Sequence, residues 1–277
     1  MMQQFVKYQS FGNDFILLDF INQSNESIEG VIHNAHWSSR IAQWCDRHRG
    51  IGADGVLILK KNSEDVHEMH VFNADGSSAE ICLNGMRCCV RHLYLQNPGK
   101  QVFQIQSVKQ VVRNQVDRSQ GPFHIITNVP FVRYERMVTI ATQEGDFTGH
   151  CVDVGNPHFI VFAEKEVGWL SEYGSLIEKH PLFPRKTNVA FVWQESQDEF
   201  QRRFRVLFYE RGCGMTLACS SGAAAVIKAL YQLGTIKKEE CIRLAMQGGI
   251  LQCMMEPQED IVLMGDAHRV FSGTLEN

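Results

Sequence analysis

The stretch Ala218-Cys219-Ser220-Ser221-Gly222-Ala223-Ala224-Ala225 places a thiol and two hydroxyls directly ahead of an alanine-rich run. A related stretch, Cys82-Leu83-Asn84-Gly85, lies 137 residues earlier. Both copies read C-x-x-G-x7-L-Y, ending at Leu93-Tyr94 and at Leu230-Tyr231. Self-similarity at a fixed offset is typical of a duplicated unit. The spacing predicts two halves, each with a helix that begins at a cysteine.

A second pair of matching segments supports the duplication. Phe11-Gly12-Asn13-Asp14-Phe15-Ile16 and Val154-Gly155-Asn156-Pro157-His158-Phe159-Ile160 each lie nearer the start of a half, with their glycines 143 residues apart. They occur in the same order as the cysteine segments and at nearly the same offset. We expect an N-terminal half over residues 1–120 and a C-terminal half over residues 121–277, with a C-terminal segment that can return to the first half.

Segments rich in Val, Ile and Phe predict strands, and helices are fewer. The predicted strands are Phe15 to Phe20, Val56 to Leu59, Met69 to Phe72, Val102 to Ile105, Phe159 to Phe162, Val189 to Trp193 and Arg205 to Tyr209. The predicted helices are Ser38 to Asp46, Cys82 to Gln96 and Cys219 to Leu233, the last with Gly234 as its stop. The pattern favours an α/β fold built from two similar halves.

Composition excludes several classes of protein. A net charge of −4 without a basic run argues against nucleic-acid binding, which needs clustered Lys and Arg. No apolar run approaches the roughly 18 to 20 residues that cross a bilayer, and the N-terminus lacks the pattern of a secretory leader. We therefore expect a globular cytoplasmic protein, with neither nucleic acid nor membrane as a partner.

The nine cysteines do not form a disulfide framework, because they are odd in number and spread through a long chain. Reduced thiols are expected. The chain has no C-x-x-C pair, and Cys82, Cys88, Cys89 and His92 would lie on different faces of one predicted helix. The spacing therefore argues against a metal site.

Most free cysteines are small buried hydrophobic residues, and this explanation suffices for six of them: Cys45, Cys88, Cys89, Cys151, Cys241 and Cys253. Cys82 and Cys219 differ, because each begins a predicted helix beside small or polar residues. A helix N-terminus binds anions and favours thiolate over thiol. The reference thiol pKa of about 8.5 can fall toward neutrality there, so each cysteine could accept a proton.

Two such cysteines suggest a reaction. Inverting a stereocentre by proton transfer needs a base on one face of the carbon and an acid on the other, and a thiolate with a thiol supplies that pair. Helix N-termini can stabilise the carboxylate end of the carbanion. Such a route requires no pyridoxal phosphate or metal, so we expect no cofactor.

Further motifs, taken in order, resemble the diaminopimelate epimerase family of pyridoxal-independent epimerases over essentially the whole chain. They are Gly12-Asn13-Asp14-Phe15, Asp46-Arg47-His48-Arg49-Gly50-Ile51-Gly52-Ala53-Asp54-Gly55, Asn73-Ala74-Asp75-Gly76-Ser77, Gly155-Asn156-Pro157-His158, Thr187-Asn188-Val189 and Glu210-Arg211-Gly212. The resemblance implies two similar domains related by pseudo-two-fold symmetry, each a mixed or antiparallel sheet wrapped around a central helix.

The same resemblance implies roles for single residues. Cys82 and Cys219 are the alternating acid and base. The residues that hold the distal amino-acid end of the substrate are Asn13, Asn73, Asn156, Asn188, Glu210 and Arg211, and those at the helix starts that contact it are Leu83, Asn84, Gly85, Ser220 and Ser221. His158 can support the cysteines. From the residues alone, Asn13 and Asn156 serve equally well as turn residues, and Glu210-Arg211 as a solvated pair. A lone histidine such as His158 is more often structural.

The chain departs from the family pattern at the helix starts. Leu83 and Ser220 stand where the family has glycine, and Met215 stands where glutamate is common. The resemblance implies epimerisation of LL-2,6-diaminopimelate to the meso form, for lysine and peptidoglycan precursors, by a homodimer. The departures leave open a racemase of another amino acid, such as histidine or glutamate. A non-catalytic amino-acid binder or redox sensor on the same scaffold is also open.

Overall fold

The computed structural model describes residues 3–23, 35–62, 66–108, 110–119, 123–164, 167–197 and 202–275. It divides into two compact units, one formed by residues 1–127 together with 265–277 and the other by residues 128–264. The last strand of the chain therefore belongs to the first unit. The expected boundary between residues 120 and 121 lies outside the described residues.

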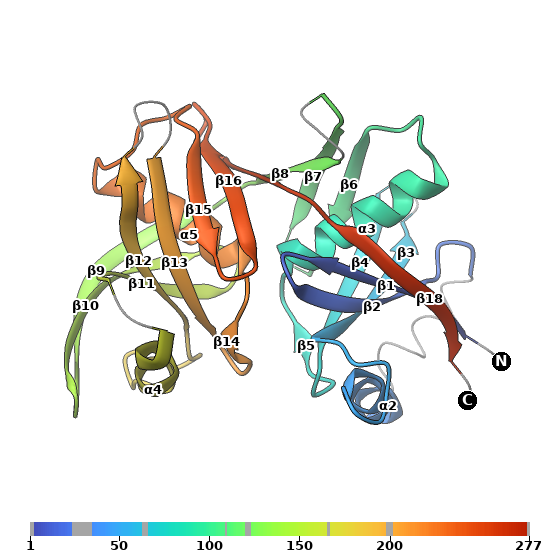
Figure 1. The fold of residues 1–277 in the computed structure, drawn as a ribbon, viewed down its shortest axis with the longest axis horizontal. Coiled ribbons are helices and arrows are strands. Elements are labelled where there is room, and N and C mark those ends of the chain that lie inside the picture. The colour runs from blue at the N-terminus through green and yellow to red at the C-terminus, as the bar shows by residue number, and fades with distance from the viewer. Residues whose placement is uncertain are drawn as a thin grey trace. The chain divides into compact units, whose positions relative to one another are not determined.

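Among the described residues, the first unit contains the helices α2 (Ala35–Cys45) and α3 (Leu83–Gln96) and a set of strands that wraps α3 (Figure 1). Its strands are β1 (Gln3–Ser10), β2 (Asn13–Asp19), β3 (Gly55–Lys61), β4 (His67–Asn73), β5 (Ser78–Ala79), β6 (Val102–Gln106), β7 (Val111–Asp117) and β18 (His268–Leu275), with β8 (His124–Val129) at the boundary to the second unit.

The second unit has the same kinds of element. Its helices are α4 (Val167–Glu178) and α5 (Ser220–Gln232). Its strands are β9 (Arg133–Thr142), β10 (Gly145–Asp153), β11 (Pro157–Phe162), β12 (Asn188–Gln197), β13 (Arg202–Glu210), β14 (Gly214–Thr216), β15 (Ile242–Met246), β16 (Gly249–Met255) and β17 (Ile261–Gly265).

Strand pairing is the same in the two units, which confirms the internal repeat. In the first unit β18, β1 and β2 are successive antiparallel neighbours, β2 is parallel to β3, and β3 is antiparallel to β4. β4 then pairs antiparallel with β5 and parallel with β6, which is antiparallel to β7. In the second unit β9 to β16 repeat these relationships in order. β18 thus occupies in the first unit the place that β9 occupies in the second.

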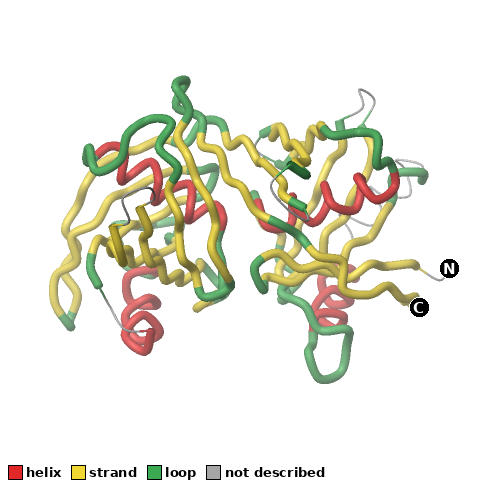
Figure 2. The backbone as a smooth tube through the Cα atoms, turned by 45° about the horizontal axis from the view of Figure 1, so that its top comes forward, coloured by secondary structure: helices red, strands yellow, loops and turns green. Residues whose placement is uncertain are grey.

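Each unit encloses one helix and carries another outside the sheet. α3 contacts β1, β2, β3, β4, β7 and β18, and α5 contacts β9, β10, β11, β12 and β16 (Figure 2). The enclosed α5 is buried from Ser220 to Leu230, as expected for a helix that is apolar on every side. Each sheet is mixed and wraps a central helix, as the sequence resemblance implies.

The central strands are buried on both faces because they lie between an inner and an outer helix. On β3, Val56 and Ile58 join a cluster with Ile41 and Trp44 of α2, whereas Leu57 faces α3 at Gly85. This explains the unbroken apolar run Gly55-Val56-Leu57-Ile58-Leu59, which shows no alternation. The β12–β13 pair lies in the same way between α4 and α5.

All seven predicted strands and all three predicted helices are confirmed by β2, β3, β4, β6, β11, β12, β13, α2, α3 and α5. α5 ends as expected, with Gly234 at φ +69 and the Thr235 N–H donating to Leu230 O at 3.0 Å. Within the described residues no helix is long and apolar enough to cross a membrane.

Candidate active site: two cysteine-capped helices

Cys82 is the N-cap of α3. Its backbone is extended, at φ −142 and ψ 100, and its Sγ accepts the Gly85 N–H at 3.3 Å. A Cβ on Gly85 would lie 2.7 Å from Leu57 Cδ2 and 3.4 Å from that Sγ. The glycine three residues after the cysteine is therefore required by the close approach of α3 to β3. The thiol is partly exposed.

Cys219 caps α5 in the same way. Its backbone lies at φ −127 and ψ 105, and its Sγ accepts the Gly222 N–H at 3.3 Å. A Cβ on Gly222 would come within 2.5 Å of the Phe208 ring on β13. The repeated C-x-x-G is thus one structural device used twice: a thiol as N-cap and a glycine where the helix crosses the sheet. This thiol is buried, 3% exposed.

The first turns of both helices suit a negatively charged ligand. A helix start leaves backbone N–H groups without intrahelical acceptors and carries the positive end of the helix dipole. Neither α3 nor α5 has an acidic residue in its first turn to neutralise that end. A carboxylate could bind at either turn.

The two cysteines have different surroundings, and one expectation is wrong. Burial raises the pKa of Cys219 well above its ordinary value, and the charge of Glu210 and a hydrogen bond with it raise that pKa further. Hydrogen bonds from Ser221, whose Oγ is 3.4 Å from Sγ, and from Gly222 oppose the rise but do not cancel it. The helix start does not bring this thiol toward neutrality, because desolvation outweighs two hydrogen bonds.

Glu210 and Arg211 end β13 and begin the turn to β14. Thr216 Oγ1 donates to Glu210 Oε1 at 2.6 Å, and the Arg211 backbone N–H donates to Asn188 Oδ1 at 3.0 Å. Asn188 Nδ2 in turn donates to Pro157 O at 2.9 Å. The structure brings these predicted residues together at one end of β11, β12 and β13.

Asn156 and His158 lie beside the same strand ends. Asn156 Oδ1 is 2.9 Å from His158 Nε2, and His158 is 2% exposed. Burial lowers the pKa of His158 to about 3, and the charge of Arg211 adds to the effect. The imidazole is therefore neutral at physiological pH, and it can act in hydrogen bonding but not as a cation.

In the first unit the structure brings Asn13 and Asn84 together. Asn13 follows the two-residue hairpin turn Phe11-Gly12, in which both residues have positive φ, 54 and 81, as such tight turns require. Asn84 Nδ2 donates to Asn13 Oδ1 at 3.2 Å. Asn73 lies at the end of β4, and its Nδ2 donates to Ser77 Oγ at 2.9 Å.

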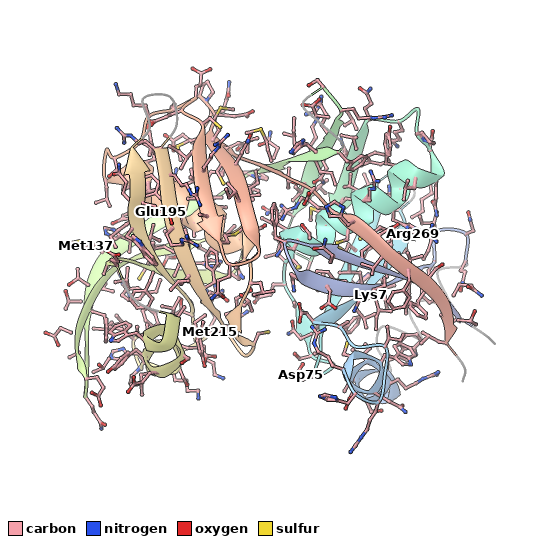
Figure 3. All side chains as sticks on the ribbon, in the orientation of Figure 1. Lys7, Asp75, Met137, Glu195, Met215 and Arg269 are labelled. Carbon is pink, nitrogen blue, oxygen red and sulfur yellow. The ribbon has the colours of Figure 1, made fainter. Side chains whose placement is uncertain are left out.

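The residues that depart from the family pattern are buried or packed. Leu83 is 1% exposed and Ser220 is 2% exposed, so both side chains belong to the packed interior around the helix starts. Met215, labelled in Figure 3, lies on β14 opposite Tyr209 and packs against the core cluster that α4 forms with β12 and β13. Met215 thus contributes to packing.

Glu178 was missed by the sequence analysis. This side chain at the end of α4 is 3% exposed, and its Oε1 accepts the Gly212 N–H at 3.0 Å. Lys186 Nζ lies 3.8 Å from the same oxygen. Glu178 therefore holds the turn that carries Arg211. The spacing of α4, interrupted by glycines, gave no signal for it.

The comparisons with known proteins agree with this architecture. The family model described as "Diaminopimelate epimerase" matches residues 5–129 and again residues 150–270. The chain belongs to the diaminopimelate epimerase family. Relatives in this family named diaminopimelate epimerase include those of Carboxydothermus hydrogenoformans, 34% identical over 98% of each chain, and Thermosynechococcus vestitus, 32% identical over 99% of this chain and 100% of the relative.

Solved structures with low sequence identity share the fold of this epimerase family member. A probable proline racemase from Agrobacterium radiobacter superposes with a TM-score of 0.75 at 11% identity, over 99% of this chain and 93% of the other. A hydroxyproline epimerase from Agrobacterium vitis gives 0.73 at 13% identity, over 99% and 92%. The fold of both units is therefore shared with proteins of low sequence identity.

Proposed function

We propose that this protein epimerises LL-2,6-diaminopimelate to meso-diaminopimelate, with Cys82 and Cys219 as the two acid–base groups. One observation carries the proposal: a member of this family has the same device in each unit, a cysteine Sγ that caps a buried helix 3.3 Å from a glycine N–H. The product would supply lysine and peptidoglycan precursors.

The proposed reaction moves two protons. A thiolate removes the α-proton, so that a C–H bond breaks and an S–H bond forms. The electron pair left on carbon is stabilised through the substrate carboxylate by helix N–H donors. The thiol of the other cysteine then gives its proton to the opposite face of the carbon and is left as thiolate. Reversal exchanges the roles, and no cofactor is needed.

The surroundings of Cys219 support an assignment of the resting state. Because burial and Glu210 raise its pKa, Cys219 rests as the thiol. Deprotonation of Cys82 would then supply the thiolate that removes the α-proton. Once Cys219 has given up its proton, the nearby carboxylate of Glu210 disfavours the thiolate left behind, which promotes reprotonation.

The polar residues around each helix supply the binding groups. Arg211 can bind the distal carboxylate through two parallel hydrogen bonds, and Glu210 with asparagine oxygens can accept from an ammonium group. The full set that we propose for substrate binding is Asn13, Asn73, Leu83, Asn84, Gly85, Asn156, Asn188, Glu210, Arg211, Ser220 and Ser221. His158 would assist as a neutral hydrogen-bonding group.

The test is turnover of LL-diaminopimelate in deuterated water. In a two-base reaction the product acquires solvent deuterium at the inverted carbon while unreacted substrate keeps its protium. Cys82→Ala and Cys219→Ala should each abolish turnover. Exchange on histidine or glutamate but not on diaminopimelate would assign a different racemase. Ligand binding without exchange, unchanged in both variants, would assign a binder or sensor.

We also propose a cytoplasmic homodimer. The nine cysteines are present as thiols, which fits a reducing compartment. In the described residues β18 pairs along β1, and Val270 on it is 55% exposed, so this edge of the first unit could pair with a second copy. Val270→Lys should then shift the protein from dimer to monomer in sedimentation equilibrium. A wild-type monomer at micromolar concentration would refute the dimer.

A further inference from the structure

Arg87 is a buried cation on the same helix as Cys82. It is 0% exposed, and its guanidinium lies 5.4 Å from the centre of the Phe11 ring. Its Nη2 donates to Asn84 Oδ1 at 2.5 Å and its Nε donates to Ser10 Oγ at 3.1 Å. A buried guanidinium is costly unless its donors are used, so a fixed arrangement of these partners is strongly favoured.

Arg87 is one end of a chain of side-chain amides. Asn84 Nδ2 donates to Asn13 Oδ1 at 3.2 Å, and Asn13 Nδ2 donates to Asp54 Oδ2 at 2.8 Å. Arg47 Nη2 donates to the other oxygen of Asp54 at 2.7 Å. The two amides therefore connect a cation at one end to a carboxylate at the other. We call Arg87, Asn84, Asn13 and Asp54 the amide relay.

The charges at its ends decide which way each amide faces. A guanidinium has only donors, so Asn84 must turn its oxygen toward Arg87 and its nitrogen toward Asn13. A carboxylate only accepts, so Asn13 must turn its nitrogen toward Asp54, which leaves its oxygen for Asn84. Reversing either amide would place two donors or two acceptors face to face. The orientation is thus determined by Arg87 and Asp54.

We propose that Arg87 is a positioning residue, which acts on substrate through Asn84 and Asn13 without touching it. This rests on the proposed function, in which both asparagines contact the amino acid. Asn84 is the second residue of α3, so Arg87 also holds the first turn that follows Cys82. Because the relay fixes the orientation of the Asn13 amide, it determines which N–H and which oxygen lone pair of Asn13 remain for the ligand. Its effect falls on binding more than on proton transfer.

The test compares Arg87→Met with Arg87→Lys and with Arg91→Met as control. Met fills most of the volume without a donor, and Lys keeps the charge but lacks the fork that reaches two acceptors. Arg91 lies one turn later on α3, with its guanidinium 3.7 Å from the Phe123 ring centre, and has no part in the relay. Arg87→Met should raise KM for LL-diaminopimelate about tenfold or more with kcat changed less than threefold. The KM of Arg87→Lys should lie between those of the wild type and Arg87→Met, and the KM of Arg91→Met should equal that of the wild type.

A double-variant cycle separates positioning from general packing. If Arg87 acts through Asn84, Arg87→Met should raise KM little further in an Asn84→Ala background, because the partner is already lost. Fully additive KM effects, or a loss confined to kcat, would overturn the proposal. If circular dichroism shows that Arg87→Met does not fold, Arg87→Lys takes its place in the cycle. The KM of Arg87→Lys is then compared with that of the Arg87→Lys, Asn84→Ala double variant.

A second readout does not depend on catalysis. In asparagine-labelled protein the side-chain NH₂ signals of Asn13 and Asn84 should exchange slowly with solvent in the wild type and in Arg91→Met, and rapidly in Arg87→Met. If the side-chain NH₂ exchange rates in Arg87→Met equal those of the wild type, the proposed relay is wrong. If wild-type protein does not turn over diaminopimelate while the exchange result holds, the proposed function fails and the relay stands.

Discussion

Two cysteines in the same local geometry have different surroundings in this protein. The repeat reproduces the N-cap at Cys82 and Cys219, but not what surrounds it. Cys219 is buried beside Glu210, whereas Cys82 is partly exposed on a helix whose second turn contains the buried cation Arg87. The two units have equivalent backbones at these positions, but the burial of the thiols and the side chains around them differ.

Removal of the carboxylate next to Cys219 should lower the pKa of that thiol, because Glu210 raises it. In Glu210→Gln we expect the Cys219 peptide to react with methyl methanethiosulfonate from a lower pH than in the wild type, as followed by mass spectrometry. Thr216→Val is the control, since it removes the hydrogen bond to Glu210 and keeps the charge. An unchanged pH profile in Glu210→Gln would show that burial alone sets the pKa.

His158 should make stability depend on pH. Its folded pKa of about 3 lies below the unfolded value of 6.5, so the unfolded chain binds the extra proton as pH falls through that interval. Stability is therefore complete above pH 6.5 and falls below it, by about 1.4 kcal/mol per pH unit for one proton. Urea unfolding at pH 7.0, 6.0 and 5.0 should show a steeper loss for wild type than for His158→Gln. Parallel slopes would contradict the assignment.

Sequence reasoning predicted a candidate site but not its electrostatics. The C-x-x-G repeat identified Cys82 and Cys219 because it is a local signal for a helix start. The raised pKa of Cys219 was missed, since it depends on burial and on Glu210, which the fold brings to the thiol. Arg87 was missed because a single arginine inside a predicted helix is usually a solvated residue.

At the scale of elements, the glycine after each cysteine sets how closely the helix approaches the sheet. Gly222→Ala would bring a Cβ to 2.5 Å from the Phe208 ring, so α5 must shift and carry Cys219 with it. We expect a loss of about 1 to 3 kcal/mol in the free energy of unfolding, together with most of the activity. Urea unfolding measures the first loss and a turnover assay measures the second, on one preparation of protein.

Gly168→Ala is the matched control for that substitution. Gly168 lies in α4, and a Cβ there meets nothing within 4 Å. Because alanine is the better helix former, the control should leave activity unchanged and unfolding free energy equal or up to about 1 kcal/mol higher. Equal effects of the two substitutions would mean that close approach to Phe208 is not the cause.

α4 should act on the site through its last residue. Glu178→Leu removes the acceptor for the Gly212 N–H and loosens the turn that carries Arg211, whereas Glu178→Gln keeps an acceptor oxygen. We expect the Leu variant to raise KM several-fold with a smaller change in kcat, and the Gln variant to stay close to wild type. Identical KM values for the Leu variant and the wild type would exclude this role.

The elements predicted correctly are those buried on both faces. β2, β3, β11 and β12 carry long apolar runs because helices cover both sides of them. Strands at the margins escaped detection, since β9 and β18 are largely exposed and carry mixed sequences such as Arg133-Tyr134-Glu135-Arg136-Met137. The pairing of β18 with β1 links the two ends of the chain, and local patterns carry no information about it.

At the scale of the whole molecule, the first unit is completed by the last strand. Leu275 of β18 lies in the core cluster with Phe5, and β18 pairs with β1 along most of its length. Deleting residues 265–277 should therefore lower protection from hydrogen exchange throughout the first unit, with residues 128–264 much less affected. Peptide-resolved exchange measures both in one sample. Equal loss in both units would show that they do not unfold separately.

The place of β18 also has a consequence for biosynthesis. A ribosome releases residues 128–264 as one continuous segment that holds the described strands of the second unit, whereas residues 1–127 must wait until residues 265–277 have been made. The half made first is thus the half finished last. During that interval the edge of β1 that β18 later covers has backbone N–H and C=O groups without strand partners, and such an edge can pair with another chain.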